Sequence, residues 1–278
     1  MISLIFAILS SAMVSITMRF AQPRVKYPTG LLCANYIVCS LFALLLSIPE
    51  LPALSLQTFS TPVGLGAING ILYLSGFVLM QWNIRNNGIV LSSVFIKLGI
   101  LVPTARSILC FGEMPTVVQA IGFLLAILAI VIVNFQKGEK ISRGSWGLLL
   151  MLLVGGMCDG MSKIYEEFGS ADVQNIFLFF TFFCALLLCL GLTFLKKEKL
   201  GWKELAYGAL LGIPNFLASL FLLHALATVP AVIAFPSFSV ATILVIALAG
   251  VLLFHERLNR KQVIGGLLIC AALVLLNL

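Results

Sequence analysis

Hydrophobic residues occur along this chain in ten runs, most of them close to twenty residues long and separated by short polar breaks. The runs cover residues 2–20, 30–48, 63–82, 88–111, 116–135, 144–165, 174–195, 205–227, 229–253 and 259–277. A helix of about twenty residues crosses the roughly 30 Å hydrocarbon core of a bilayer. Strands of a membrane barrel would alternate over about ten residues instead. The pattern therefore predicts an all-α membrane protein with ten transmembrane helices.

The breaks contain the residue types that end helices. Pro28 and Gly30 form one break, Asn86 to Gly88 another, and Pro115 a third. No break is longer than about fourteen residues, which leaves no room for an extramembrane domain.

Composition excludes several classes of protein. Of the 278 residues, 61% are hydrophobic and only 10% are charged, whereas an average soluble domain is about half apolar and roughly a quarter charged. Soluble enzymes, nucleic-acid binders, disordered tails and disulfide scaffolds are therefore excluded. The net charge of +7 reports the orientation of loops rather than a nucleic-acid partner.

The basic residues are concentrated in alternate loops. Thirteen of the seventeen lie in odd-numbered loops: Arg24, Lys26, Arg85, Lys137, Lys140, Arg143, Lys196, Lys197, Lys199, Lys203, Arg257, Arg260 and Lys261. The even-numbered loops carry Glu50, Glu113 and Asp172 but no lysine or arginine. Because basic loops stay cytoplasmic, this pattern predicts a multi-pass protein of the cell membrane with both termini outside the cytoplasm.

The sequence contains an internal repeat. Residues 111–134 recur as residues 254–277, and ten of the 24 aligned positions are identical. The identities include the polar pairs Glu113/Glu256, Gln119/Gln262 and Asn134/Asn277. An offset of 146 also aligns Asn69 with Asn215. The chain is thus predicted to consist of two five-helix halves, residues 1–135 and 144–278.

The number of helices in each half has a structural consequence. Since five is odd, the second half must enter the membrane inverted relative to the first. Inverted repeats characterise secondary transporters, in which two similar halves exchange conformations around a site near the bilayer midplane. The repeat therefore predicts alternating access.

Several short motifs resemble those of a known family. They are Asn35-Tyr36, Lys97-Leu98 followed by Pro103, Asp159 with Lys163, Gly212 to Asn215, and the Phe/Gly-x-Glu turn before the last helix of each half. Together with the ten spans, they resemble the EamA-like branch of the drug/metabolite transporter superfamily over essentially the whole chain. The resemblance implies a small-metabolite transporter with a central cavity between its halves. It does not select among amino acids, nucleotide sugars, sugar phosphates, cations and lipid-linked sugars.

Lys97 is the first candidate for a substrate-binding residue. It lies about ten residues into the run at 88–111, hence roughly 15 Å deep. A lysine near the bilayer centre costs about 2.5 to 3.5 kcal/mol on insertion scales, so it requires a cavity or a partner. It could attract an anionic substrate, or it could form a structural ion pair with Asp159 or bind backbone carbonyls.

Asp159 and Lys163 have the i, i+4 spacing of an intrahelical pair. Asp159 could bind a proton or cation, or could only balance Lys163. Together with Arg19, Lys97 and Arg106, Lys163 gives four cations within the predicted spans. These outnumber the deep carboxylates, which favours an anionic or zwitterionic substrate such as an amino acid or a carboxylate.

Polar and kink-forming residues within the spans complete the candidate site. Asn35, Tyr36 and Asn215 could bind neutral groups of a substrate or join neighbouring helices. Pro103, Pro214 and Pro236 are candidates for gating because each frees a backbone carbonyl. Glu113 and Glu256 are interpreted as turn residues or as residues at the start of the helices that follow them, in preference to a role in transport.

No catalytic, metal-binding or cofactor-binding motif occurs. The seven cysteines, all within apolar runs, are interpreted as small buried hydrophobes rather than as disulfide or metal partners. The expected partners are a small molecule, the lipid bilayer and, if transport is coupled, an ion. One chain contains both halves, so a monomer suffices and a dimer is compatible with the sequence.

The sequence therefore favours a secondary active transporter of a small organic metabolite, and not an enzyme. In the superfamily that the chain resembles, small proton-coupled exporters of cations use a carboxylate in the first helix. The run at 2–20 contains no acidic residue, so the resemblance argues against that mechanism here. Two alternatives stay open: an exporter of cationic or amphipathic compounds coupled through Asp159, and a membrane subunit that does not transport.

Overall fold

The computed structural model describes residues 1–21, 23–53, 56–87, 92, 95–96, 98–134, 145–198, 200–254 and 260–278. Of the residues named above, Gly88, Lys97, Lys199, Glu256 and Arg257 lie outside this part of the chain, as does the basic loop at 137–143.

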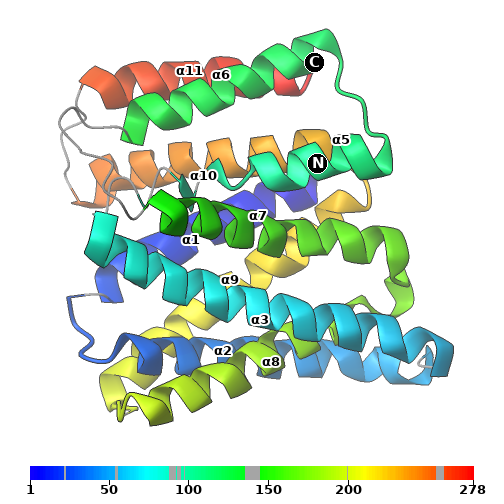
Figure 1. Ribbon diagram of the computed structural model, residues 1–278, viewed down its shortest axis with the longest axis vertical. Coiled ribbons are helices and arrows are strands. Elements are labelled where there is room, and N and C mark those ends of the chain that lie inside the picture. Colours follow the sequence, from blue (N-terminus) through cyan, green and yellow to red (C-terminus); the bar gives the residue numbers. More distant parts are fainter. Residues whose placement is uncertain are drawn as a thin grey trace. The chain divides into compact units, whose positions relative to one another are not determined.

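The described residues form ten α-helices and two short 3₁₀ helices. The α-helices are α1 (Ile2–Ala21), α2 (Pro28–Ser47), α3 (Leu56–Asn87), α5 (Leu101–Phe111), α6 (Val117–Asn134), α7 (Ser145–Phe168), α8 (Gln174–Leu195), α9 (Trp202–Leu226), α10 (Ala231–Phe254) and α11 (Arg260–Leu276), with η1 (Ile48–Ala53) and η2 (Ala171–Val173) between them (Figure 1). Seven helices are long and apolar enough to cross a membrane, and three apolar helices are shorter. The predicted all-α membrane fold is confirmed.

One predicted helix is interrupted. The run at 88–111 predicts a single helix, but Gly99 and Ile100 form a turn and α5 begins at Leu101. Pro103 favours this restart because it has no N–H to donate to the carbonyl of Gly99, and a proline is tolerated in the first turn of a helix. The prediction of one unbroken helix is therefore wrong in this respect.

A second helix is longer than predicted. The run at 144–165 ends at the last apolar residue, whereas α7 continues to Phe168. The extra residues include Glu166 and Glu167, which the hydropathy pattern had assigned to a loop. Lys163 supplies the reason for the continuation, since its ammonium group binds both carboxylates one turn away.

The chain divides into two compact units. Unit 1 contains residues 1–74 and 161–227, and unit 2 contains residues 75–160 and 228–278. Each unit therefore takes helices from both predicted halves of the sequence. The division into residues 1–135 and 144–278 describes a repeat in the sequence and stays a prediction.

Unit 1 is built around α2, which lies beside both α8 and α9 (Figure 1). α2 and α8 are antiparallel, because Thr29 at the start of α2 binds Glu198 after the end of α8. Glu50, which follows α2, binds the first turn of α8. A small apolar cluster of Ala21, Leu31 and Leu211 joins α1, α2 and α9.

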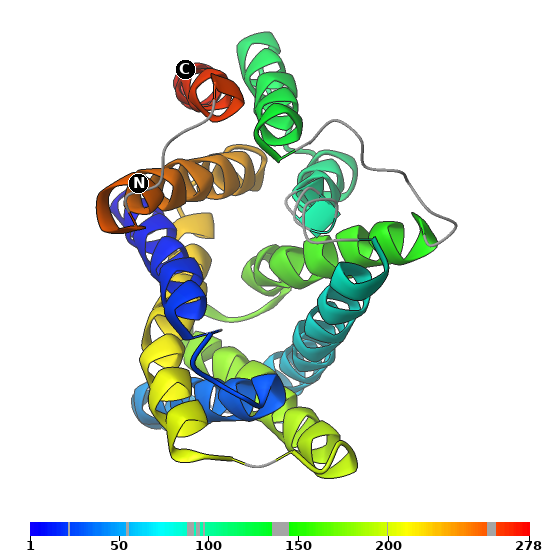
Figure 2. The same cartoon turned by 90° about the vertical axis from the view of Figure 1, so that its left-hand side faces the viewer.

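Unit 2 contains the pairs α5 with α10 and α6 with α11 (Figures 1 and 2). The core of the second pair includes repeat-equivalent residues. Ala126 and Ile269, like Ala129 and Ala272, lie 143 positions apart in sequence and in one buried cluster. Equivalent positions of the two halves thus lie together in one core between α6 and α11.

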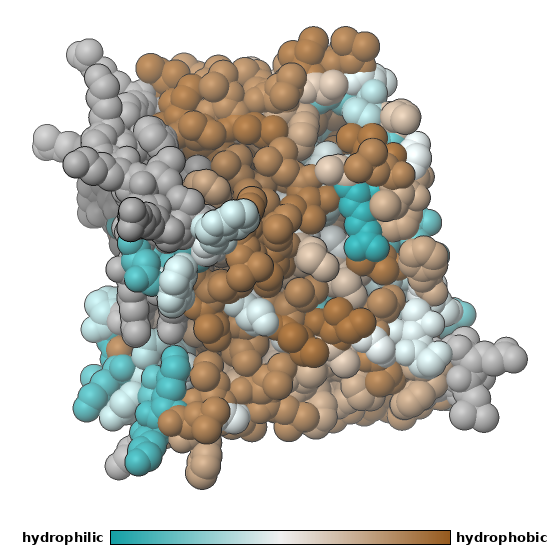
Figure 3. Space-filling view, in the orientation of Figure 1, coloured by the Kyte–Doolittle hydropathy of each residue, from teal (hydrophilic) through white to brown (hydrophobic). Residues whose placement is uncertain are grey.

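The outer surface of the helices is mostly hydrophobic. In the space-filling view, hydrophobic side chains cover the middle of the helices and hydrophilic ones gather mainly toward their ends (Figure 3). Large exposed side chains include Leu124, Leu187 and Leu267. A soluble protein would not expose so many, so this surface is suited to contact with lipid.

Candidate functional site

Two predicted site residues, Asn35 and Asn215, meet at the contact between α2 and α9. The side-chain amide of Asn215 donates to Asn35 Oδ1 at 3.2 Å. Asn35 is only 1% exposed. Its neighbour one turn on, Cys39, donates through Sγ to the carbonyl of Gly212 at 3.3 Å. These contacts form a buried polar patch inside unit 1.

The polar patch extends to α3 through two residues that sequence reasoning missed. Ser219 donates to the carbonyl of Asn215 at 3.3 Å, and its hydroxyl lies 3.0 Å from the hydroxyl of Tyr73. The Tyr73 ring packs edge-on against Phe182 of α8. The i, i+4 spacing of Asn215 and Ser219 was a usable signal, because such residues share a helix face.

We call these five residues, Asn35, Cys39, Tyr73, Asn215 and Ser219, the amide–hydroxyl cluster. It brings together amide, thiol and hydroxyl groups from three helices of unit 1. Such groups can donate to and accept from a neutral or zwitterionic molecule, and they can equally hold helices together.

Two glycine pairs allow the helices that carry this cluster to approach closely. On α9, a Cβ at Gly208 would lie 2.5 Å from the carbonyl of Leu31, and one at Gly212 would lie 2.8 Å from the carbonyl of Asn35. Both sites face the backbone of α2. Small residues at i and i+4 are the usual means by which membrane helices pack backbone against backbone.

The same arrangement recurs between α3 and α8. A Cβ at Gly66 would lie 2.8 Å from the carbonyl of Phe177, and one at Gly70 would lie 2.6 Å from that of Thr181. The glycines of the two pairs are 142 positions apart, and the facing carbonyls of α2 and α8 are 146 apart. The contact of α3 with α8 is therefore the repeat equivalent of the contact of α9 with α2.

This equivalence corrects one alignment made from sequence. At an offset of 146, Asn69 is aligned with Asn215. The packing of the glycines instead aligns α3 with α9 at an offset of 142 residues, which is about one helical turn less than 146. At this offset Tyr73 is the counterpart of Asn215. Asn69 is buried elsewhere on α3, and its Oδ1 has no hydrogen-bond partner.

Lys163 is held by two acidic residues that lie beyond the predicted end of its helix. Its Nζ lies 2.5 Å from Glu166 Oε2 and 2.6 Å from Glu167 Oε1. The Lys163 side chain is 7% exposed, and those of the glutamates are 26% and 37% exposed. The count of cations over carboxylates within the spans is therefore wrong at this position, where one cation meets two carboxylates.

The other predicted site residues are placed as follows. Tyr36 is buried on α2, next to Asn35. Asp159 is exposed on α7, one turn before Lys163. Pro103 lies in the first turn of α5, whereas Pro214 and Pro236 are buried inside α9 and α10.

The equivalent helices α2 and α8 cap each other. An acidic residue that follows each helix binds the first turn of the other. The Glu50 carboxylate accepts from the backbone N–H of Asn175 at 2.9 Å and of Ile176 at 3.2 Å, at the start of α8. Glu198 accepts from the backbone N–H of Thr29 at 3.3 Å and from its hydroxyl, at the start of α2. The N-terminus of a helix favours such an acceptor because its N–H groups are unpaired.

Glu113 acts in the same way. It lies in the turn between α5 and α6, which is one of the two places predicted for it, but its carboxylate accepts from the backbone N–H of Val232 on α10 at 2.9 Å rather than from the helix that follows it. The start of α6 is capped instead by Thr116 and Gln119, whose side chains accept from each other's backbone N–H. Glu256, the repeat equivalent of Glu113, lies outside the described residues.

Unit 2 contains one further feature of note, a cavity of about 210 Å³ beside the start of α10. Its walls are almost entirely apolar and include Thr104, Phe123 and Val232. The hydroxyl of Thr104 has no hydrogen-bond partner. Among the described residues, no three metal-ligating side chains converge on one point.

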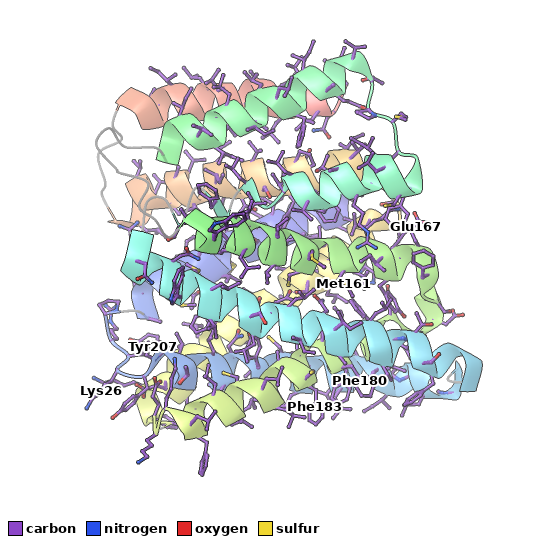
Figure 4. The ribbon with its side chains drawn as sticks, viewed as in Figure 1. Lys26, Met161, Glu167, Phe180, Phe183 and Tyr207 are labelled. Carbon is purple, nitrogen blue, oxygen red and sulfur yellow. The ribbon has the colours of Figure 1, made fainter. Side chains whose placement is uncertain are left out.

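The two ends of the unit 1 helices differ in charge. Lys26 and Tyr207 lie at one end, and Glu167 lies at the other (Figure 4). Because Glu198 binds the start of α2, the lysines at the end of α8 belong to the end that carries Lys26. Glu50 binds the opposite end of α8, which is the acidic end.

The fold and these contacts define a class of protein: a polytopic membrane protein in which equivalent helices of an inverted repeat pair with each other. Residues 141–278 match the model of the EamA-like transporter family. The chain belongs to the EamA-like transporter family, which is a family of transporters and not of enzymes.

Two further likenesses extend over nearly the whole chain. An uncharacterised protein of Haemophilus influenzae (strain KW20/Rd) is 26% identical over 277 residues, covering 95% of this chain and 93% of that protein. A crystal structure of another protein superposes with a TM-score of 0.79 at 14% identity, covering 99% of this chain and 94% of that one. The second likeness is one of fold alone.

Proposed function

We propose that this protein is a secondary active transporter that moves a small organic metabolite across the cell membrane by alternating access. The observation that carries the proposal is the pairing of equivalent helices. α2 with α8 and α5 with α10 pair antiparallel through reciprocal or capping contacts, and α6 pairs with α11 through equivalent residues. Halves related in this way can exchange conformations, and that exchange is the basis of alternating access.

The proposed substrate is anionic or zwitterionic, such as an amino acid or a carboxylate. Lys163 already meets two carboxylates, so it contributes little net positive charge. The attraction for a carboxylate is therefore assigned to Lys97, whose charge is costly within a membrane unless it has a function or a partner. Asn35, Tyr36 and Asn215 supply groups that can bind the polar part of a zwitterion.

A charge-sorted ligand screen tests this proposal. The purified protein and its Lys97→Ala variant are heated with amino acids, carboxylates and organic cations, and unfolding is followed by a fluorescent thiol probe or light scattering. A ligand at a hundred times its Kd stabilises the folded state by about 2.7 kcal/mol. We expect anions or amino acids to raise the Tm of the wild type but not of Lys97→Ala, and uptake into liposomes to be lost in that variant.

Lys97→Arg is the matched control, because it keeps the charge and should retain part of the ligand response. Full uptake by Lys97→Ala would remove Lys97 from the site. If organic cations stabilise both proteins and uptake depends on pH until Asp159→Asn abolishes that dependence, the cation exporter is the better description. Copurification of a stoichiometric partner, with no flux in liposomes, would favour a subunit that does not transport.

A further inference from the structure

Two buried cysteines face each other where α2 crosses α8. The Sγ atoms of Cys33 and Cys189 are 3.2 Å apart, and both residues are free thiols with no exposed surface. A disulfide requires about 2.05 Å between its sulfur atoms. An approach of about 1 Å would therefore join the two helices.

Neighbouring groups hold both thiols in this position. Thr193 lies on α8 one turn after Cys189, and its Oγ1 atom is 3.2 Å from Cys33 Sγ. Cys189 Sγ donates to the carbonyl of Thr29 at 3.5 Å. Thr29 is itself bound by Glu198 through its N–H and its hydroxyl. The two sulfur atoms are thus fixed on a rigid contact rather than on mobile segments.

We propose that Cys33 and Cys189 form an oxidisable pair, which a small neutral peroxide converts into a disulfide linking α2 to α8. One thiol attacks a peroxide oxygen, giving a sulfenic acid and one water. The second thiol then displaces that hydroxyl, forming the S–S bond and a second water. Two thiols and hydrogen peroxide therefore become one disulfide and two waters, with sulfur oxidised and oxygen reduced.

Burial selects the reagents that reach this pair. Neither cysteine has exposed surface, and both lie in helices suited to span the membrane. A charged reductant such as glutathione is excluded from such a position, whereas hydrogen peroxide is small and uncharged. The disulfide, once formed, is expected to persist until a neutral dithiol or unfolding gives access to it.

The position of the pair indicates its effect. α2 and α8 are equivalent helices, and each end of their contact is closed by a glutamate, Glu50 at one end and Glu198 at the other. An exchange of the two halves maps this contact onto itself, so it does not have to open. We therefore expect the disulfide to stabilise the protein without stopping flux, and this expectation about flux rests on the proposed function.

The test begins with the full-length protein in detergent, treated with hydrogen peroxide and digested without reduction. Mass spectrometry should detect a peptide pair joining Cys33 to Cys189, lighter by two hydrogens than the reduced peptides. We expect oxidation to raise the Tm of the wild type by roughly 5 °C. Cys33→Ser should lose both the linked peptide and the rise in Tm.

Cys39→Ser is the matched control. Cys39 is also buried on α2, but its sulfur faces α9 rather than α8. This variant should keep the linked peptide and the rise in Tm. Absence of the linked peptide from the oxidised wild type, or its presence with no change in Tm, would overturn the proposal.

Flux through proteoliposomes then tests the effect on transport. Uptake by the oxidised wild type should stay within twofold of the reduced protein. A loss of uptake that a neutral dithiol reverses, seen in the wild type but not in Cys33→Ser, would contradict the rigid contact between α2 and α8. If neither form transports any solute, the proposed function fails, while the linked peptide still decides the chemistry of the pair.

Discussion

At the scale of single residues, polar side chains within this protein find partners that hydropathy does not reveal. Lys163 is bound by two glutamates that a hydropathy boundary had left outside the helix. Asn35 is buried and accepts a hydrogen bond from Asn215. A buried amide that loses its partner costs more than the bond itself contributed, because the remaining group is desolvated and unpaired.

Asn215→Leu should therefore destabilise the protein by about 1 to 3 kcal/mol. The substitution removes the amide that donates to Asn35 Oδ1 at 3.2 Å and keeps a side chain of similar size. The Tm in detergent, measured with and without the change, gives the cost.

The matching double variant, Asn35→Leu with Asn215→Leu, should be less unstable than Asn215→Leu alone. Replacing both partners leaves no orphaned polar group, and such paired replacements can be nearly neutral. If the loss of stability in the double variant equals the sum of the losses in the two single variants, the amide–amide contact contributes nothing.

At the scale of helices, the close packing of neighbouring helices in unit 1 depends on the positions of glycines. Gly70 on α3 and Gly212 on α9 lie against carbonyl groups of α8 and α2. A carbonyl of a helix backbone cannot move aside cheaply, because it is already bonded within its own helix. Gly64 lies on the same helix as Gly70, but a Cβ there would meet nothing within 4 Å.

Gly70→Ala should destabilise the protein by about 1 to 3 kcal/mol through overpacking against α8. A Cβ at this position would lie 2.6 Å from the carbonyl of Thr181. Gly64→Ala is the control, and it should be neutral or stabilising by up to about 1 kcal/mol, since alanine has the higher helix propensity. Thermal unfolding of the two variants side by side decides the matter, and equal stabilities would refute close packing of α3 on α8.

At the scale of the whole molecule, basic and acidic residues gather at opposite ends of the helices. Within unit 1, Lys26 marks a basic end and Glu167 an acidic end (Figure 4). By the positive-inside rule we expect the basic end to face the cytoplasm. With the predicted ten spans, both termini are then expected on the other side of the membrane.

This orientation predicts the behaviour of reporter fusions. Alkaline phosphatase fused after Leu278 should be active, and green fluorescent protein at the same position should be dark. Fusions that end within residues 196–203 should give the opposite pair of results, because that loop carries Lys196, Lys197, Lys199 and Lys203. A fluorescent C-terminal fusion would place the C-terminus in the cytoplasm, contradict this orientation and show that one span is miscounted.

Much of the fold followed from sequence because a bilayer imposes its own length on each helix. The hydropathy pattern gave α8 (Gln174–Leu195) its bounds to the residue and gave most other helices to within a few residues. Its largest error is α3, which spans Leu56–Asn87 where the run at 63–82 was predicted. It also failed where a boundary depends on local contacts: the turn at Gly99 before Pro103, and the last turn of α7, which Lys163 stabilises. A hydropathy pattern reflects only the free energy of moving each side chain out of water. It does not include the contacts between particular residues that extend or interrupt a helix.

The site was predictable only in part. The motifs named Asn35 and Asn215, and the structure brings them into contact, but Tyr73, Ser219 and the facing thiols of Cys33 and Cys189 were not foreseen. The sequence by itself determined the spans, the repeat and the family, since these follow from composition, period and identity. Only the tertiary structure decided which helix each glycine, glutamate and cysteine meets. A contact between residues more than a hundred positions apart depends on how helices cross, and no local pattern records that.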